Sequence, residues 1–448
     1  MTIIWGILCL GVIVFIHEAG HFLAARCCGV SVESFSVGMG PVIWHRTIGS
    51  TDYRISLLPL GGYCGMKGEK AFQQALDQKL SYIPAEPDSF YGVHPGKRIC
   101  IAFAGPFANL VFACIAFTVI AMVGYTYYSA DNRVIMADEL YADTASPAHA
   151  AGMQTGDRII SIDGTPIQSF ADITRAAAVR PNETVPITVS RGGAVHTFSV
   201  TLQMDSATGS GRLGVVSWIE PVVDSVAPES AAAQAGLLPQ DRITAINGAA
   251  VRNTADIQKA AQGLSSFVIT VERGGEQLEF TYTAAAQEQA LIDGLYFALP
   301  ALEAPVYPLF PAILEGIKDT AEMCALSVKS IVLLFQGADL SQAVSGPVRI
   351  TVMLGDTVKS GFSAGLAEGV SSILNFLALI SISLFIMNLL PIPILDGGLI
   401  LAAVLQLLLR RQIHPKIIYY TQFIGAAIIL LIFVFALFND IQYLLQRH

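Results

Sequence analysis

The chain has 448 residues, of which 53% are hydrophobic and 14% are charged, and its mean hydropathy is +0.57. Soluble domains usually carry about 25% charged residues, so the composition excludes an entirely soluble enzyme and indicates that part of the chain lies in a membrane. The net charge of −9 argues against a nucleic-acid-binding protein, which usually presents a basic surface.

The first apolar segment, residues 1–28, contains three ionisable side chains, His17, Glu18 and His21. In an HExxH pattern on a helix, the two histidines lie one turn apart and can share a zinc ion, while the glutamate reaches a water molecule on the metal. Each ionisable group inside a span costs roughly 2.5–3.5 kcal/mol and usually marks function. A proton or ion path lined by the same residues is the alternative. No signal-peptide cleavage site follows, so we expect a retained span.

Residues 29–97 are expected to form a β-loop on the cytoplasmic side. Apolar and polar side chains alternate over residues 32–37, as in a half-buried strand. A turn is predicted at 38–41, and short strands are predicted at 42–44 and 54–57. An edge of this loop is a candidate for binding an extended peptide by strand addition. A hairpin that contacts no peptide is the alternative.

Three further segments, 99–130, 369–395 and 417–439, have the roughly 20 uncharged, apolar residues needed to cross a bilayer. Basic residues mark span ends that face the cytoplasm. They predict that both termini and the acidic middle lie on the outer side of the membrane and that the HExxH site lies toward the cytoplasmic side. Asn109, a lone amide in the second span, is expected to bond another helix and is left out of the catalytic set. The basic residues at span ends are Arg26, Lys97, Arg98, Arg410, Arg411 and Lys416.

The acidic middle, residues 129–306, contains an internal repeat. It holds 10 Lys and Arg against 20 Asp and Glu, and residues 151–164 and 235–248 share the pattern A-G-(M/L)…D-R-I…I-(D/N)-G. Each copy predicts a short helix that ends at a glycine, then a strand and a tight Asp-Gly or Asn-Gly turn. This order resembles PDZ domains, which bind extended peptides and often capture a C-terminal carboxylate. Residues 212–215 are a candidate carboxylate nest, and a space-filling role is the alternative.

Segment 305–368 carries charges at helical spacing, which predicts an amphipathic helix at the membrane surface rather than a fifth span. The third span, 369–398, ends in Pro-Ile-Pro-Ile-Leu-Asp-Gly-Gly. Such broken backbone is tolerated at membrane depth only beside protein or a wet cavity. A catalytic zinc needs a third protein ligand, and Asp396 is the only acidic residue in this span. We therefore favour it as that ligand over a simple exit turn.

Three features together resemble the site-2 protease family of intramembrane zinc metalloproteases, and most closely its bacterial regulators of sigma-E. They are HEAGH in the first span, LDG at the end of a later span, and PDZ-like copies between them. The resemblance covers essentially the whole chain, with further matching stretches at residues 58–63, 104–109, 345–347 and 437–440. It implies one Zn²⁺ per chain with ligands His17, His21 and Asp396, the acid/base Glu18, and substrate-backbone contacts at Asn388, Pro391 and Pro393.

The resemblance implies hydrolysis of a peptide bond within the transmembrane segment of single-span proteins. It also implies that the membrane is a bacterial inner membrane, with both termini and the PDZ-like copies in the periplasm and the active site toward the cytoplasmic side. The expected substrates are an anti-sigma factor already trimmed on its outer side and leftover signal peptides. The other expected partners are the lipid bilayer and peptide C-termini at the PDZ-like copies, with no nucleic acid. Two other classes stay open from the residues, a PDZ-bearing membrane scaffold with a vestigial metal site and a metal or proton transporter.

The expected fold is a polytopic α-helical membrane protein of about four spans. It includes a membrane-associated β-loop and two tandem periplasmic PDZ-like α+β domains. The expected segments are 1–28 (first span), 29–97 (β-loop region), 98–128 (second span), 129–220 and 221–304 (PDZ-like domains), 305–368 (amphipathic helices), 369–398 (third span), 399–416 (cytoplasmic loop) and 417–448 (fourth span and tail).

Overall fold

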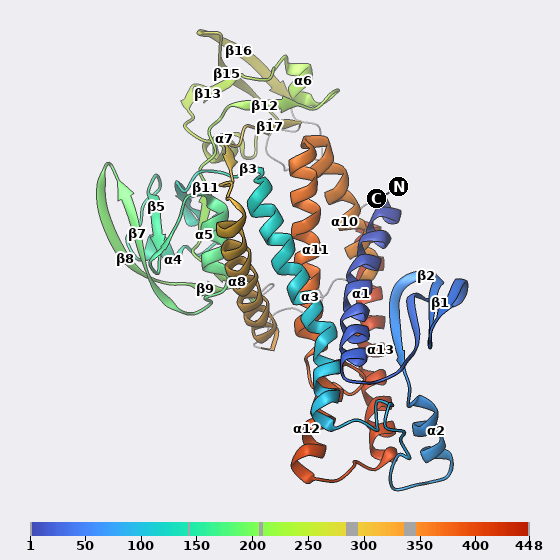
Figure 1. The fold of residues 1–448 in the computed structure, drawn as a ribbon. Coiled ribbons are helices and arrows are strands. Elements are labelled where there is room, and N and C mark those ends of the chain that lie inside the picture. The colour runs from blue at the N-terminus through green and yellow to red at the C-terminus, as the bar shows by residue number, and fades with distance from the viewer. Residues whose placement is uncertain (1, 142–143, 206–208, 284–293, 336–345, 447–448) are drawn as a thin grey trace. The chain divides into compact units, whose positions relative to one another are not determined.

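The computed structural model describes residues 2–141, 144–205, 209–283, 294–335 and 346–446. The chain divides into two compact units, a helical unit and a β-rich unit, which are described separately (Figure 1). Of the described residues, the helical unit contains those of 2–125, 304–332 and 346–446, and the β-rich unit contains those of 126–303 together with 333–335.

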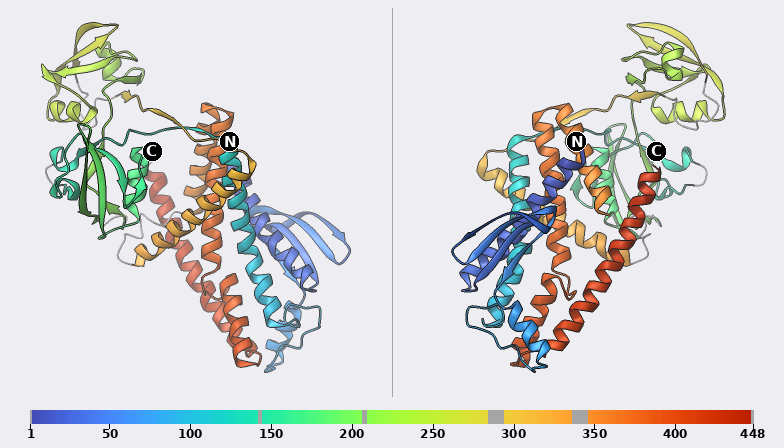
Figure 2. Two further views of the ribbon diagram at one scale, coloured as in Figure 1. Left: turned by 60° about the vertical axis from the view of Figure 1, so that its left-hand side comes forward. Right: turned by 90° about the vertical axis from the view of Figure 1, so that its right-hand side faces the viewer.

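Four helices in the described residues are long and apolar enough to cross a membrane, as the sequence predicted. One of them, α3, packs against both α1 and α11 (Figure 1, Figure 2). Small residues permit the close approach, since a Cβ on Gly20 of α1 would overlap the Ala104 carbonyl of α3. The chain is therefore a polytopic membrane protein. The four helices are α1 (Thr2–Cys27), α3 (Pro95–Val123), α11 (Leu366–Asn388) and α13 (Pro415–Gln446).

The segment before α11 forms two further helices, α8 (Leu309–Phe335) and α10 (Pro347–Ala364). Helix α8 is not among the four candidate spans, which agrees with its expected amphipathic character. The start of α10 is held by Asp440 of α13, whose carboxylate accepts hydrogen bonds from the Gly346 and Val348 backbone N–H groups at 3.0 and 2.9 Å. The stretches 345–347 and 437–440, which both match the family, therefore contact each other here. Ser345 lies outside the described residues.

The chain after α11 differs from the expected boundaries. Helix α11 ends at Asn388, and Asp396 begins a separate helix, α12 (Asp396–Leu409). The expected single span 369–398 is therefore interrupted, and most of the expected loop 399–416 is helical. The reason is local, because the two prolines between the helices lack the backbone N–H that a continuous helix needs. The acidic residue then begins α12, where the helix dipole favours negative charge.

Residues 32–66 form the expected β-loop as two long antiparallel strands, β1 (Val32–Ile48) and β2 (Thr51–Met66). Residues 34–37 of β1 pair with 52–55 on one side and with 62–65 on the other. The loop is thus a small folded-over sheet, and residues 62–66 form one of its edges. A short helix, α2 (Glu69–Asp77), follows it.

The β-rich unit confirms that the repeat in the sequence is a repeat in the fold. Each copy has a four-stranded sheet with the same strand order, β6-β5-β7-β8 in the first and β14-β13-β15-β16 in the second. Each has its own apolar core. In both predicted tight turns the two central residues have positive φ, at Asp163-Gly164 and Asn247-Gly248.

Both copies place equivalent elements at equivalent positions. The first copy contains α4 (Pro147–Ala150), β5 (Arg158–Ile162), β6 (Thr165–Pro166), α5 (Phe170–Ala178), β7 (Thr184–Arg191) and β8 (Ala194–Thr201). The second contains α6 (Ala231–Ala235), β13 (Arg242–Ile246), β14 (Ala249–Ala250), α7 (Thr254–Ala261), β15 (Ser266–Arg273) and β16 (Glu276–Thr283).

Short strand pairs complete this unit, and one of them joins its two ends. Strand β3 (Thr126–Tyr128) pairs antiparallel with β18 (Ala301–Glu303), with Tyr128 opposite Ala301. The other pairs are β4 (Val134–Met136) with β11 (Val215–Ser217), β9 (Gln203–Met204) with β10 (Gly211–Arg212), and β12 (Val223–Val226) with β17 (Leu295–Phe297), and the turn Ala137–Glu139 is a short 3₁₀ helix.

Candidate metal centre

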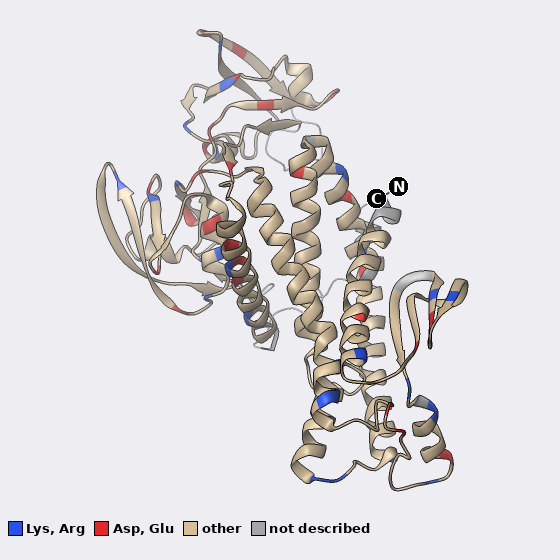
Figure 3. Ribbon diagram, in the orientation of Figure 1, with Lys and Arg blue, Asp and Glu red and all other residues tan. Residues whose placement is uncertain are grey.

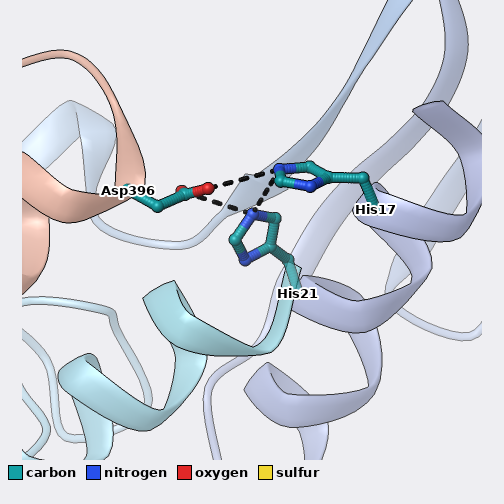
Figure 4. Close-up of side chains that lie close together, drawn as sticks. All are labelled: His17, His21 and Asp396. Carbon is teal, nitrogen blue, oxygen red and sulfur yellow. Dashed lines mark hydrogen bonds and ion pairs between the residues drawn. The ribbon is translucent and has the colours of Figure 1, made fainter. Parts of the chain in front are cut away.

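Three of the predicted site residues converge at one point (Figure 4). His17 and His21 project from successive turns of α1, and Asp396 projects from the first turn of α12. The Asp396 carboxylate oxygens lie 3.2 Å from His17 Nε2 and 3.3 Å from His21 Nε2, and the two Nε2 atoms lie 3.2 Å apart. All three side chains are at least 86% shielded from solvent. Residues 375 positions apart in the chain are thereby combined in one cluster.

These three atoms fit the donor set and spacing of a zinc ion. Two imidazoles and one carboxylate are a common protein ligand set of catalytic zinc, which leaves a fourth position open. With metal–ligand bonds of about 2.0–2.1 Å, ligand atoms at the corners of a tetrahedron lie about 3.3 Å apart. The measured separations are 3.2–3.3 Å. The cluster can therefore take one zinc ion with little movement of its side chains.

The ring nitrogens that face away from the cluster also have partners. His21 Nδ1 lies 2.8 Å from the Ile101 carbonyl of α3, and His17 Nδ1 lies 3.2 Å from the Asn109 side-chain amide. Asn109 is fully buried, and its Oδ1 has no hydrogen-bond partner in the described structure. Oxygen and nitrogen of an amide are exchanged by a half-turn, which would point Oδ1 at a protonated His17 Nδ1. Such a contact fixes a metal-binding histidine with Nε2 free for the metal.

Sequence reasoning set Asn109 aside as a helix–helix contact. Its side chain does cross from α3 to α1, but the group that it contacts is one of the two HExxH histidines. The signal that could have found it is its isolation, since an amide inside an apolar span needs a polar partner.

Glycines provide the space that the cluster occupies. A Cβ on Gly105 of α3 would overlap the imidazole of His21. On α12, a Cβ on Gly397 would overlap the Leu390 carbonyl, and a Cβ on Gly398 would overlap that of Ile392. The glycines after Asp396 thus allow the start of α12 to pack against the chain that leads into it. This packing positions the carboxylate.

Glu18 lies beside the cluster but is not part of it. The metal-binding group formed by the described residues consists of His17, His21 and Asp396. The Glu18 side chain instead lies against β2, because its carboxylate is close to the Cys64 backbone and its Cγ would be 3.2 Å from a Cβ on Gly62. Burial raises the pKa of the Cys64 thiol to about 12, so this cysteine stays protonated and is a poor metal ligand.

The residues expected to hold substrate backbone lie on the chain between α11 and α12. Asn388 is the last residue of α11, one turn or more before Asp396 begins α12. Pro391 is exposed and Pro393 half-buried. Ile394, which follows Pro393, has a φ of 114°, a value that a β-branched residue rarely adopts. The structure thus places these residues near Asp396 in the chain but not within the cluster.

The candidate nest at residues 212–215 is engaged within its own copy of the repeat. The Leu213 carbonyl accepts a hydrogen bond from the Ala148 N–H, and the Gly214 carbonyl accepts one from the Ser146 hydroxyl. Gly214 itself has a φ of 69°, a conformation that glycine readily adopts. These contacts tie the segment to the start of α4. Peptide capture there stays a prediction.

Comparison with known proteins gives consistent matches along the chain. The family described as Peptidase family M50 matches residues 5–432. A Treponema pallidum protein named as a zinc metalloprotease is 43% identical over 447 residues, which cover 99% of both chains. The regulator of sigma E protease of Haemophilus influenzae is 31% identical and covers 98% of this chain and 99% of its own. The regulator of sigma-E protease of Escherichia coli is 30% identical and covers 97% of each.

Proposed function

Because the chain belongs to peptidase family M50 and is a zinc metalloprotease, we propose that it cleaves single-span membrane proteins within their transmembrane segments. In this proposal His17, His21 and Asp396 hold the zinc ion and Glu18 is the general acid/base. The other two functions considered, a scaffold and a transporter, leave the family membership unexplained.

The observation that carries the proposal is the position of the cluster. His17, Glu18 and His21 all lie within the candidate span Gly6–Cys27, and Asp396 begins the next helix after the candidate span Leu366–Asn388. A hydrolytic centre built from these residues can act only on a peptide bond that comes close to the membrane spans. This favours a substrate bond inside or close to the bilayer.

Each side chain then has a definite part in hydrolysis. Zinc, when bound, supplies a Lewis acid that polarises the scissile carbonyl. Glu18 takes a proton from the attacking water and delivers it to the leaving amine nitrogen. Its position against the Cys64 and Gly62 backbone of β2 keeps the carboxylate at one side of α1, next to but outside the ligand set. Asn109 and the Ile101 carbonyl keep the two imidazoles oriented.

The β-loop offers an edge strand that could hold the substrate in an extended form. A transmembrane helix hides its own carbonyls in hydrogen bonds, so it must be extended before cleavage. Residues 62–66, one edge of the β-loop, contact α1 at Glu18. An extended peptide added to this edge would pass the general base, in the manner of strand addition. Asn388, Pro391 and Pro393 would contact the peptide from the side of α12.

The names of the relatives supply the proposed substrate class. Two relatives are named as regulators of sigma E, which suggests a pre-trimmed anti-sigma factor as substrate here, with leftover signal peptides as further substrates. The two copies of the repeat are proposed to be PDZ-like domains on the periplasmic side of the inner membrane. They would either bind peptide C-termini or exclude substrates that still carry an outer domain.

Co-expression with candidate single-span proteins tests the proposal. The wild-type chain should release fragments cut within the span, and Glu18→Gln should release none while its zinc content stays at the wild-type level. Glu33→Gln, the same substitution at an exposed position of β1, is the matched control and should cleave like the wild type. Cleavage by Glu18→Gln at the wild-type rate would remove Glu18 from the mechanism.

A further inference from the structure

A second polar site lies in the helical unit, away from the metal cluster. A cavity of about 560 Å³ opens where α3 begins and α12 ends. Its wall consists of residues 91–95 and Arg98 around the start of α3, of residues 406 and 407 in the last turn of α12, and of residues 410–412 just after that helix. The candidate span Pro95–Val123 begins in this wall. The cavity therefore lies where helices enter the apolar layer, at the depth of lipid headgroups.

The cavity is basic. Arg98, Arg410, Arg411 and His94 line it, and no acidic residue does. Basic residues are visible at this end of α3 beside α12 (Figure 3). Among the described residues, none of the three arginines forms an ion pair. The positive end of the α3 dipole points to the same place. The lining thus favours an anion.

Arg98 shows that this is more than a basic surface. The residue is only 7% exposed, and its Nε has no hydrogen-bond partner in the described structure. The Gln406 Oε1 in the same wall is also buried without a partner. An arginine stays charged inside a protein, and an unpaired buried charge is strongly destabilising. A phosphate can satisfy the guanidinium with two parallel hydrogen bonds.

The apolar side chains around the cavity indicate which kind of phosphate compound it binds. Leu407 lines it, and the next two residues of α12, Leu408 and Leu409, are 75% and 54% exposed. A ligand with a charged head and apolar chains fits this combination better than a free phosphate ion. We propose that the cavity binds the phosphate headgroup of an anionic phospholipid, with its acyl chains along these apolar side chains.

The site connects to the metal cluster through two helices. Arg98 lies one turn before Ile101, whose carbonyl contacts His21, and α12 runs from Asp396 to the edge of the cavity. A lipid headgroup held here would tie the ends of both helices together. The lipid site does not depend on the proposed substrate, and it can be tested without a cleavage assay.

Native mass spectrometry of the full-length, detergent-purified protein tests the site. The probes are phosphatidylglycerol, phosphatidylcholine and inorganic phosphate. The wild-type chain should retain one phosphatidylglycerol at least about tenfold more tightly than phosphatidylcholine. Both lipids carry the phosphate, but the choline ammonium would lie among three arginines, and like charges placed together cost at least that factor. Arg98→Gln should abolish this preference. Arg46→Gln, at an exposed position of β1, is the control and should keep it.

A second variant guards against misfolding of Arg98→Gln. Arg410 and Arg411 are exposed, so their joint replacement by glutamine should leave the fold and the zinc content unchanged and still weaken phosphatidylglycerol binding several-fold. Equal binding of the two lipids to the wild type, or full binding by both variants, would overturn the proposal. Displacement of phosphatidylglycerol by millimolar phosphate in the wild type, but not in Arg98→Gln, would show that the ligand of the cavity is a free phosphate ion and not a lipid.

Discussion

The side-chain amide of Asn109 lies 3.2 Å from Nδ1 of His17, while Nε2 of the same ring lies 3.2 Å from the Asp396 carboxylate. The ring is thus held on both sides by residues from two other helices. A carbonyl acceptor at Nδ1 keeps the proton there and leaves the Nε2 lone pair for a metal. The amide links α3 to the metal cluster without being a ligand itself.

Replacing Asn109 by alanine should weaken zinc binding by about 10- to 100-fold, the usual effect of losing such a partner of a ligating histidine. The measurement is competition with a chelator on purified protein. Ser381→Ala is the control, because Ser381 is equally buried in α11 and its hydroxyl has no partner. An unchanged zinc affinity in Asn109→Ala would show that the amide serves only helix packing.

Much of the fold follows from local patterns in the sequence. Four apolar runs gave four helices, and alternating residues gave β1. The dipeptides Asp163-Gly164 and Asn247-Gly248 gave the two tight turns of the repeat. Each of these signals acts over a few neighbouring residues, so one sequence is enough to detect it.

Contacts between distant segments were predicted less well. His17, His21 and Asp396 could be predicted to form one site because a catalytic zinc ion needs a third protein ligand. No such rule predicts the partner of Asn109, because that partner depends on how α3 is rotated against α1. The break before α12 was visible in the prolines, but the renewed helix after it was not, since a single sequence does not show whether a chain leaves the membrane there. The buried, unpartnered Nε of Arg98 is likewise visible only once α3 and α12 are packed.

Purified protein should contain about one zinc per chain, because three ligands and an open position complete one tetrahedral site. His21→Ala and Asp396→Ala should each lower this occupancy, as each removes one of the three converging atoms. Elemental analysis after dialysis against a weak chelator gives the measurement. Full occupancy in Asp396→Ala would mean that this carboxylate is not a ligand.

Gly105→Ala should impair metal binding although Gly105 has no polar side chain. The added methyl group would overlap the His21 imidazole and push its Nε2 out of the cluster. Gly6→Ala is the matched control, because its methyl group would lie 2.6 Å from Thr351 on α10, at another contact of α1. Both variants should lose stability on heating, but only Gly105→Ala should have a raised zinc dissociation constant. Equal zinc affinities in the two would contradict the assigned role of the glycine.

The proposed membrane orientation can be tested with single cysteines at exposed positions. In a variant whose native cysteines are replaced, Val195→Cys should react with an impermeant thiol reagent added from the periplasmic side, and Gln74→Cys should not. Val195 is 65% exposed on β8 and Gln74 is exposed on α2, so neither label depends on unfolding. The reverse labelling pattern would overturn the orientation drawn from basic residues at the span ends.

The paired ends of the β-rich unit allow its removal without cutting the helical unit. Tyr128 of β3 lies opposite Ala301 of β18 in an antiparallel pair. Replacing residues 129–300 by Asn-Gly should therefore close a two-residue hairpin and keep the distance between the chain ends.

This excised variant tests whether the two repeat copies act as a size filter. The metal ligands and Glu18 all lie outside the removed residues, so zinc content should match the wild type and a trimmed substrate should still be cleaved. If the copies exclude bulky outer domains, the variant should also cleave an untrimmed substrate that the wild type rejects. A variant that binds zinc and cleaves the trimmed substrate but still rejects the untrimmed one would rule out the filter. Loss of cleavage of the trimmed substrate, with zinc retained, would instead indicate that the copies deliver the peptide to the active site.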